Sequence, residues 1–205
     1  MEKSKDYLQV EFCNDGVFVT NSGILVNILH PTPQMIEIED IAHALSNICR
    51  YGGHSKKFYS VAQHSLFVCL LAPKHLKKEA LLHDAAEAYT GDVVKPLKVI
   101  LGEKYECIEA GFMRAISARF GLNASLLPLV KKYDMMAYDL ETEWLRRGNA
   151  TPIMNAVKDA KKSCLELWMS ITESTLSNYF FMHAYNYYFD RYWDTYPGNL
   201  TWDMY

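Results

Sequence analysis

The sequence predicts a mainly α-helical bundle with a short β flap near its N-terminus. Residues 17–27 hold two short apolar runs on either side of an Asn-Ser-Gly turn at 21–23, a pattern typical of a hairpin. After Pro31 and Pro33 the apolar residues recur at helical spacing. The chain has 205 residues, of which 50% are hydrophobic and 22% charged, so it can bury the core that such a bundle needs.

The elements follow from this pattern and from its breaks. We expect strands at 17–20 and 24–27, and a first helix that carries Ile41, Leu45 and Ile48 before a glycine pair at 52–53. The next helices, each closely followed by a proline or a glycine, are expected at 60–71, 76–89, 103–120 and 128–147. Residues 161–192 are expected to add one or two helices before a tail that begins at Pro197.

A single domain is expected over residues 1–205, because no repeat, low-complexity tract or flexible linker divides the chain. Its core is expected at about 17–145, with a helical, aromatic-rich part at 150–205. The aromatic residues between Tyr179 and Tyr205 are predicted to pack in a core or against another subunit rather than to stack on bases.

Charge and composition argue against several classes of protein. The 21 basic and 24 acidic residues leave a net charge of −3, whereas proteins that bind nucleic acid polymers usually have a basic excess. No apolar stretch is long enough for a transmembrane helix, and no secretory signal is expected. The 5 cysteines form no Cys-x-x-Cys pair, which is typical of a cytoplasmic protein without disulfides.

The segment 81–92 contains the first candidate chemistry. On the helix expected at 76–89, His83, Asp84 and Glu87 would share one face. Three ionisable groups among alanines and leucines are costly unless they are paired or bound to a cation. Asp92 follows Gly91, where a loop could return it towards that face.

Two further helices offer matching ligands. His64 lies on an apolar stripe of the helix expected at 60–71; alone it would be a core histidine, but beside His83 and Asp84 it suggests a metal site. The helix expected at 128–147 offers the fourth ligand. Asp134 and Glu141 share a face of that helix, and Asp139 is a competing candidate that points elsewhere by its spacing.

In order, these motifs resemble the His … His-Asp … Asp pattern of the HD-domain phosphohydrolases. The runs YSVAQHS (59–65), LHDAAEAYTGD (82–92) and KYD (132–134) are similar to family motifs, and RYGGH (50–54) is similar to the lead-in of small nucleotide-acting members. The resemblance covers about residues 17–145 and implies the HD-domain helical fold.

The resemblance also implies roles for individual residues. A divalent metal of the Zn, Mn, Co or Fe class, with a possible second Mg, would be held by His64, His83, Asp84 and Asp134. Acid and base roles would fall to Glu87 and Asp92.

Substrate-binding candidates surround these motifs. Arg50 precedes a Gly-Gly turn and suits phosphate oxygens, and Lys98 follows the Asp92 loop. His54 is expected to donate to phosphate or to cap its loop, and Tyr51 and Gln63 are candidates to line a base or sugar pocket.

Three functions stay open. The resemblance implies a deoxynucleoside triphosphate hydrolase similar to compact phage enzymes that act on dATP, or alternatively a 5′-deoxynucleotidase of the bacterial type that hydrolyses deoxynucleoside monophosphates. A non-catalytic HD-fold ligand-binding domain is the third. We expect a small deoxynucleotide as the ligand, no nucleic acid polymer, no membrane, and assembly into a homo-oligomer.

Overall fold

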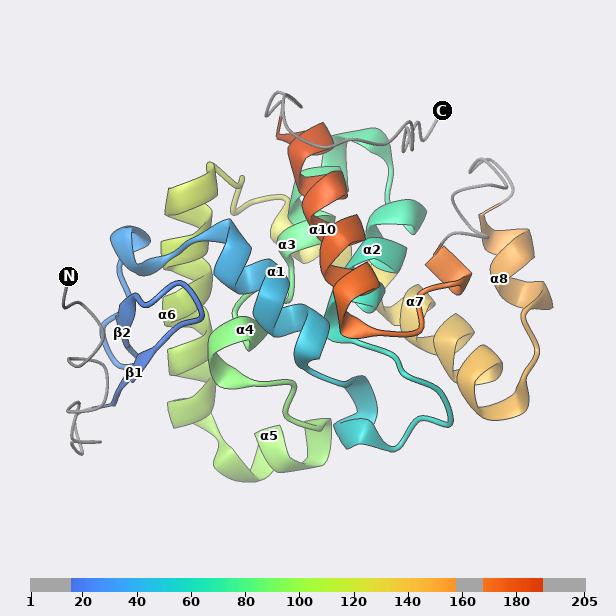
Figure 1. The fold of residues 1–205 in the computed structure, drawn as a ribbon, viewed down its shortest axis with the longest axis horizontal. Coiled ribbons are helices and arrows are strands. Elements are labelled where there is room, and N and C mark those ends of the chain that lie inside the picture. Colours follow the sequence, from blue (N-terminus) through green and yellow to red (C-terminus); the bar gives the residue numbers. More distant parts are fainter. Residues whose placement is uncertain (1–15, 158–167, 190–205) are drawn as a thin grey trace, which may run out of the picture.

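The computed structural model describes residues 16–157 and 168–189 and is mainly helical, with one small sheet (Figure 1). The strands are β1 (Val17–Val19) and β2 (Leu25–Asn27). The helices are α1 (Ile38–Asn47), α2 (Val61–Leu71), α3 (Lys77–Leu82), α4 (Glu87–Thr90), α5 (Lys95–Leu101), α6 (Glu103–Phe120), α7 (Leu127–Arg147), α8 (Thr151–Ala156) and α10 (Ser174–Tyr188). The predicted fold class, a helical bundle with a short N-terminal β flap, is confirmed.

The β flap is an antiparallel hairpin fastened to the first helix. Strands β1 and β2 pair with Phe18 opposite Val26, whose side chain is fully buried. At the turn, the backbone N–H and the hydroxyl of Ser22 donate to the two oxygens of Asp40 on α1, at 2.7 and 2.6 Å. This buried carboxylate therefore anchors the hairpin on the bundle.

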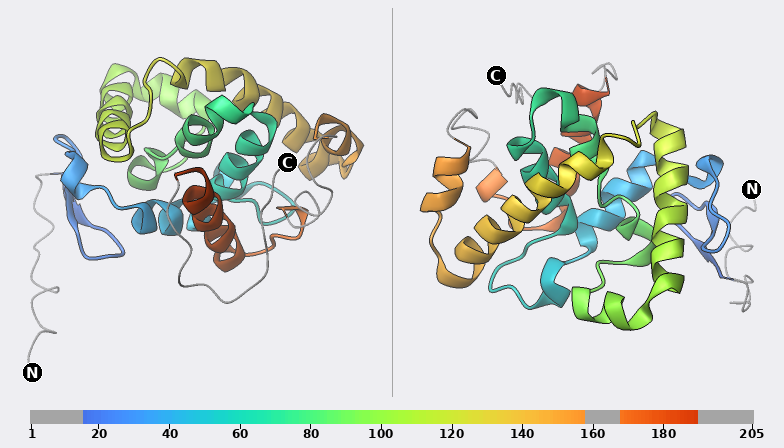
Figure 2. Two further views of the ribbon diagram at one scale, coloured as in Figure 1. Left: turned by 90° about the horizontal axis from the view of Figure 1, so that it is seen from above. Right: turned by 180° about the vertical axis from the view of Figure 1, so that it is seen from behind.

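Helix α2 forms the centre of the bundle. It packs against α1, α3, α7 and α10, and Figure 2 shows these helices around it from two directions. Ten of its eleven residues are buried, which is the behaviour expected of a helix that is apolar on every side. Each fully buried side chain such as Leu66 or Phe67 contributes about 1.5–3 kcal/mol through burial.

The N-terminus of α2 is closed by a capping box. The Ser60 hydroxyl accepts from the Gln63 N–H, and the Gln63 side chain accepts from the Ser60 N–H. An isolated antiparallel β-bridge pairs the backbone of Cys49 with that of Ser60. The turn that begins at Arg50 is therefore anchored next to the N-terminus of α2.

The helix predicted at 76–89 is interrupted, which corrects the sequence analysis. Helix α3 ends at Leu82, residues 83–86 form a tight turn, and α4 starts at Glu87. At this turn several backbone N–H groups donate to the carbonyl three residues before, as from Ala85 N to Leu82 O at 3.1 Å and from Glu87 N to Asp84 O at 2.9 Å. Such bonds place residues closer to three per turn, and the apolar pattern of the sequence does not distinguish them from an α-helix.

The other predicted helices agree with the structure within a few residues. Helix α6 has the predicted bounds, because Gly121 takes the left-handed conformation that ends it. Helices α5 and α8 were not predicted from the sequence. The part of 161–192 that the structure describes contains α10, and the predicted tail at Pro197 lies outside the described residues.

Helix α10 belongs to the core of the bundle. Its Phe180, Phe181 and Tyr185 side chains are buried, and the helix packs against α1, α2 and α3. The aromatic residues that the structure describes in this part of the chain therefore include core residues, as expected. Within residues 16–157 and 168–189, every helix is too short or too polar to cross a lipid bilayer.

Candidate metal centre

Two imidazole rings face each other inside the bundle. His64 comes from the middle of α2 and is fully buried, and His83 follows the last residue of α3. Their ring centroids are 5.3 Å apart. The Nε2 atoms of both rings are buried and have no hydrogen-bond partner in the described part of the chain. Buried polar atoms without a partner are rare, so this pair needs an explanation.

The opposite ring nitrogens are both engaged. His83 Nδ1 lies 2.8 Å from the Ala80 carbonyl oxygen, and because a carbonyl only accepts, Nδ1 carries the proton and donates it. His64 Nδ1 lies 2.7 Å from Glu141 Oε1 and donates to it. This arrangement directs Nε2 of each ring towards the space between them, as ligating histidines require.

Carboxylates complete the cluster. Asp84 Oδ2 lies 3.1 Å from His83 Nε2 and 3.5 Å from His64 Nε2. Asp134 Oδ1, from α7, lies 3.2 Å from His64 Nε2. Donor atoms of His64, His83 and Asp134 lie within 4.8 Å of one another and form a candidate metal-binding group. The Asp84 and Asp134 side chains are 22% and 15% exposed, so solvent reaches the carboxylate side of the cluster.

Mutual charges set the protonation of these groups. Burial raises the pKa of Asp134, but His64 outweighs it and holds the pKa well below its usual range. Burial likewise raises the pKa of Asp84, and the two histidines with Arg50 outweigh it. Burial and Arg50 lower the pKa of His64, while Glu141 and Asp134 outweigh them and raise it to about 9. A cation at this point would replace a proton as the partner of the carboxylates.

Arg50 lies beside the cluster. Its Nη1 atom is 3.6 Å from Asp84 Oδ2 and its Nε atom is 3.8 Å from Glu141 Oε2. The next residue, Tyr51, adopts a left-handed backbone conformation with φ 59° and donates its hydroxyl to Glu141 Oε2 at 3.2 Å. A tyrosine in this conformation is unusual and typical of a functional turn.

Glu87, Asp92 and Lys98 form the other side of the site. Lys98 Nζ lies 3.3 Å from Glu87 Oε1 and 2.8 Å from Glu109 Oε1. Burial, with the charges of Asp84 and Asp92, raises the pKa of Glu87 to about 9, although Lys98 lowers it. Burial also raises the pKa of Asp92, against the lowering effect of Arg50. The carboxyl group of Glu87 thus favours the protonated form, and the pKa of Asp92 is shifted in the same direction.

The structure does not support Gln63 as a substrate-binding residue. Gln63 is fully buried, its oxygen accepts from the Ser60 N–H at 3.0 Å, and its nitrogen donates to the Ile171 carbonyl at 3.1 Å. It closes the N-terminus of α2 and ties it to the segment before α10. The motif placed Gln63 next to His64, but successive helical residues point in different directions.

His54 and Asp139 also lie outside the cluster. The His54 side chain is exposed, and in the described chain its ring makes no hydrogen bond to the cluster; its backbone N–H closes the turn by donating to Tyr51 O. Asp139 is exposed on α7, as its spacing indicated. The structure therefore favours the loop-capping role for His54 that the sequence analysis left open.

Two contacts in the site were not indicated by the sequence, one at Glu141 and one at Lys98. Helical spacing places Glu141 on the face of Asp134 and predicts no partner for it, whereas the structure joins Glu141 to His64, Tyr51 and Tyr59. Glu109, from α6, shares Lys98 with Glu87. The shared helix face was the only signal for Glu141, and nothing in the sequence pattern indicated Tyr59 or Glu109.

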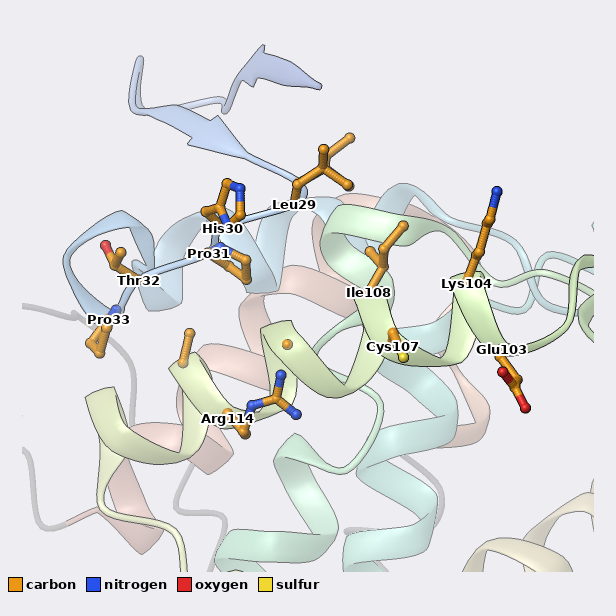
Figure 3. A pocket seen from close by; sticks show the side chains of 13 residues that line it. Leu29, His30, Pro31, Thr32, Pro33, Glu103, Lys104, Cys107, Ile108 and Arg114 are labelled. Carbon is orange, nitrogen blue, oxygen red and sulfur yellow. The ribbon is translucent and has the colours of Figure 1, made fainter. Parts of the chain in front are cut away.

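A separate pocket lies at the flap end of the molecule. It has a volume of about 870 Å³ and lies between the segment that follows β2 and helix α6 (Figure 3). None of the predicted site residues lines this pocket, and its wall includes Leu29, Pro31 and Ile108. Among the described residues, the group of donor atoms that lie close enough together for a cation is the one around His64; His30, Glu103 and Cys107 of the pocket wall do not form such a group.

Comparison with known proteins gives two relatives. No family model matches the chain. The uncharacterized protein YfdR of Escherichia coli K12 is 40% identical over 124 residues, which cover 60% of this chain and 69% of YfdR. An uncharacterized protein of Rhodobacter capsulatus is 38% identical over 135 residues, with the same shares of the two chains.

The chain belongs to the YfdR family. Both family members are described only as uncharacterized proteins, so they supply no activity to compare with the cluster.

Proposed function

We propose that this YfdR family member is a divalent-metal-dependent phosphohydrolase that acts on deoxynucleotides, foremost on deoxynucleoside triphosphates such as dATP. One observation carries the proposal: the Nε2 atoms of His64 and His83, which make no hydrogen bond among the described residues, converge with two carboxylates whose pKa values are lowered. The resemblance to the HD-domain phosphohydrolases supplies the reaction class. We place the enzyme in the cytoplasm, as a homo-oligomer.

The residues fit a metal ion of the borderline class. Two imidazole nitrogens and the carboxylates of Asp84 and Asp134 form a mixed donor set that suits Mn²⁺, Co²⁺, Fe²⁺ or Zn²⁺. Such an ion supplies two effects when bound, since it lowers the pKa of water and offsets charge on a phosphoryl oxygen.

Arg50 and Lys98 bind the phosphate groups in this proposal. Arg50 lies 3.6 Å from Asp84 and Lys98 lies 3.3 Å from Glu87, so both cations border the cluster from different segments. A guanidinium can form two parallel hydrogen bonds to phosphate oxygens, and an ammonium adds a compact charge.

Glu87 and Asp92 handle protons. The Oε2 atom of Glu87 is buried and has no hydrogen-bond partner among the described residues, and its raised pKa favours a carboxyl group that can hold a proton. We assign to Glu87 the proton that the leaving 5′ oxygen of the deoxynucleoside requires, and to Asp92 the second acid–base position.

The alternative substrate is a deoxynucleoside monophosphate. Hydrolysis to the deoxynucleoside breaks the same bond, between phosphorus and the 5′ oxygen, so the same cluster and the same proton donor would serve. The two substrates differ in the number of phosphate charges that Arg50 and Lys98 must bind.

Product analysis tests the proposal. Purified protein is treated with a chelator, reloaded with Mn²⁺ or Co²⁺, and incubated separately with dATP and dAMP. We expect deoxyadenosine and tripolyphosphate from dATP; phosphate release from dAMP with intact dATP would instead establish the monophosphatase. No product from any deoxynucleotide would contradict both enzymatic functions and favour a ligand-binding domain.

A further inference from the structure

Glu141 is the most completely buried charge near the cluster. Its side chain has no exposed surface, although it lies on α7, a helix with many exposed residues. Oε1 accepts from the Tyr59 hydroxyl at 2.7 Å and from His64 Nδ1 at 2.7 Å. Oε2 accepts from the Tyr51 hydroxyl at 3.2 Å and lies 3.8 Å from Arg50 Nε.

Packing alone does not account for this carboxylate. A buried carboxylate loses its hydration, and an apolar side chain of similar size would fill the same volume without that cost. Histidine, arginine and two tyrosines offset the cost by providing donors and positive charge. They come from residues 50–64, which are distant in sequence from α7, so the side chain of Glu141 ties α7 both to the turn at Arg50 and to α2.

Glu141 is also placed differently from a ligand. It contacts His64 through Nδ1, whereas Asp84 and Asp134 lie near Nε2 on the other side of the ring. Both of its oxygens already accept hydrogen bonds. Its geometry is that of a group that orients a ligating imidazole from behind.

We propose that Glu141 is a positioning residue that directs His64 Nε2 at the metal site and at the same time holds the turn that presents Arg50. The proposal rests on the proposed function in so far as His64 ligates a metal. It goes beyond that function by joining two parts of the site, since one carboxylate fixes a metal ligand and a phosphate-binding arginine.

The conformation of Tyr51 supports the proposal that Glu141 holds the turn next to Arg50. Tyr51 and Gly52 both have φ 59° and ψ 27°, a left-handed conformation that a tyrosine adopts only when its surroundings compensate for the strain. The hydrogen bond from its hydroxyl to Glu141 is such a compensation, and Arg50 is the residue directly before this turn.

Metal affinity measured without nucleotide tests whether Glu141 orients His64. Binding of Mn²⁺ and Zn²⁺ is measured by calorimetry for the wild type, Glu141→Gln and the control Glu143→Gln. The control removes one negative charge from the same helix, but Glu143 is paired only with Arg147 in the described chain. We expect Glu141→Gln to weaken binding about 10- to 100-fold, and Glu143→Gln to bind like the wild type.

The outcomes separate the two proposals. Equal affinity of a folded Glu141→Gln and the wild type would overturn the positioning role and leave the proposed function standing. A wild type that binds neither ion would overturn both.

A measurement on the wild type covers the case in which Glu141→Gln does not fold. In the Zn²⁺-loaded protein, ¹⁵N NMR shifts of the His64 ring report which nitrogen carries the proton. We expect the proton on Nδ1, and a proton on Nε2 would overturn the proposal.

A second variant tests whether Glu141 holds the turn that presents Arg50. Tyr51→Phe retains Glu141 and His64 but removes the bond that holds the turn. We expect this variant to bind Mn²⁺ like the wild type and to raise the KM for the nucleotide several-fold with a smaller change in kcat. An unchanged KM would overturn the link to Arg50.

Discussion

His64 and His83 lie with their rings 5.3 Å apart, and each presents a buried Nε2 atom without a hydrogen-bond partner in the described chain. Their closest polar neighbours are carboxylate oxygens of Asp84 and Asp134, at 3.1 and 3.2 Å, so nitrogen and oxygen donors converge on one point. Such a convergence of imidazoles and carboxylates suits a divalent cation. The predictions below follow from that interpretation.

Asp134→Ala is expected to reduce bound metal to background and to abolish hydrolysis, because it removes an oxygen 3.2 Å from His64 Nε2. Asp139→Ala is the matched control, since it removes an exposed carboxylate from the same helix. Metal content after dialysis, measured by mass spectrometry, checks both variants. Normal metal content in Asp134→Ala would exclude this residue as a ligand.

Glu87→Gln is expected to retain metal and to slow turnover by about 10²-fold or more, the usual scale for a lost acid–base group. Glu109→Gln is the control, because Glu109 shares Lys98 with Glu87 but comes from α6. The measurement is kcat under saturating nucleotide, together with metal content. Loss of metal in Glu87→Gln would mean that Glu87 is a ligand rather than a proton donor.

Lys98→Ala is expected to raise the KM for a deoxynucleoside triphosphate about 10- to 100-fold, since a charge-assisted hydrogen bond contributes about 1.5–3 kcal/mol. Lys95→Ala removes an exposed lysine from the same helix and is expected to change the KM little. Steady-state kinetics for both variants checks this. Equal effects of the two substitutions would indicate a diffuse charge effect instead of a phosphate contact.

Gln63→Leu is expected to lower the free energy of unfolding by about 1–3 kcal/mol, because it leaves the Ser60 N–H and the Ile171 carbonyl without their side-chain partner. The KM is expected to stay unchanged in the folded variant. Chemical denaturation and steady-state kinetics measure the two effects. A raised KM with normal stability would restore Gln63 as a substrate-binding residue.

Much of the fold was predictable because the sequence marks it locally. The helix at 103–120 ends at a glycine, and the hairpin around 21–23 contains a turn sequence, so both were found within a residue or two. The turn at 83–86 was not predictable, because Leu82, Ala85 and Ala86 are buried in either a helix or a tight turn. Helix α5 was missed because it has no buried residue and hence no apolar stripe facing a core.

The candidate site was predictable to the extent that its residues are marked by motifs. The structure brings together His64, His83, Asp84 and Asp134, which the sequence singled out. Gln63 lies outside this cluster, because its side chain points from α2 towards the Ile171 carbonyl. A sequence motif does not specify the direction in which a helical side chain points. The partners of Glu141 come from other segments of the chain. The sequence pattern does not show which side chains of distant segments come into contact.

Anomalous X-ray diffraction from crystals loaded with Mn²⁺ or Zn²⁺ tests the central claim most directly. We predict one strong peak within coordination distance of His64 Nε2, His83 Nε2, Asp84 and Asp134. Crystals that show no peak at this cluster, under conditions in which the ion is present in excess, would contradict the account.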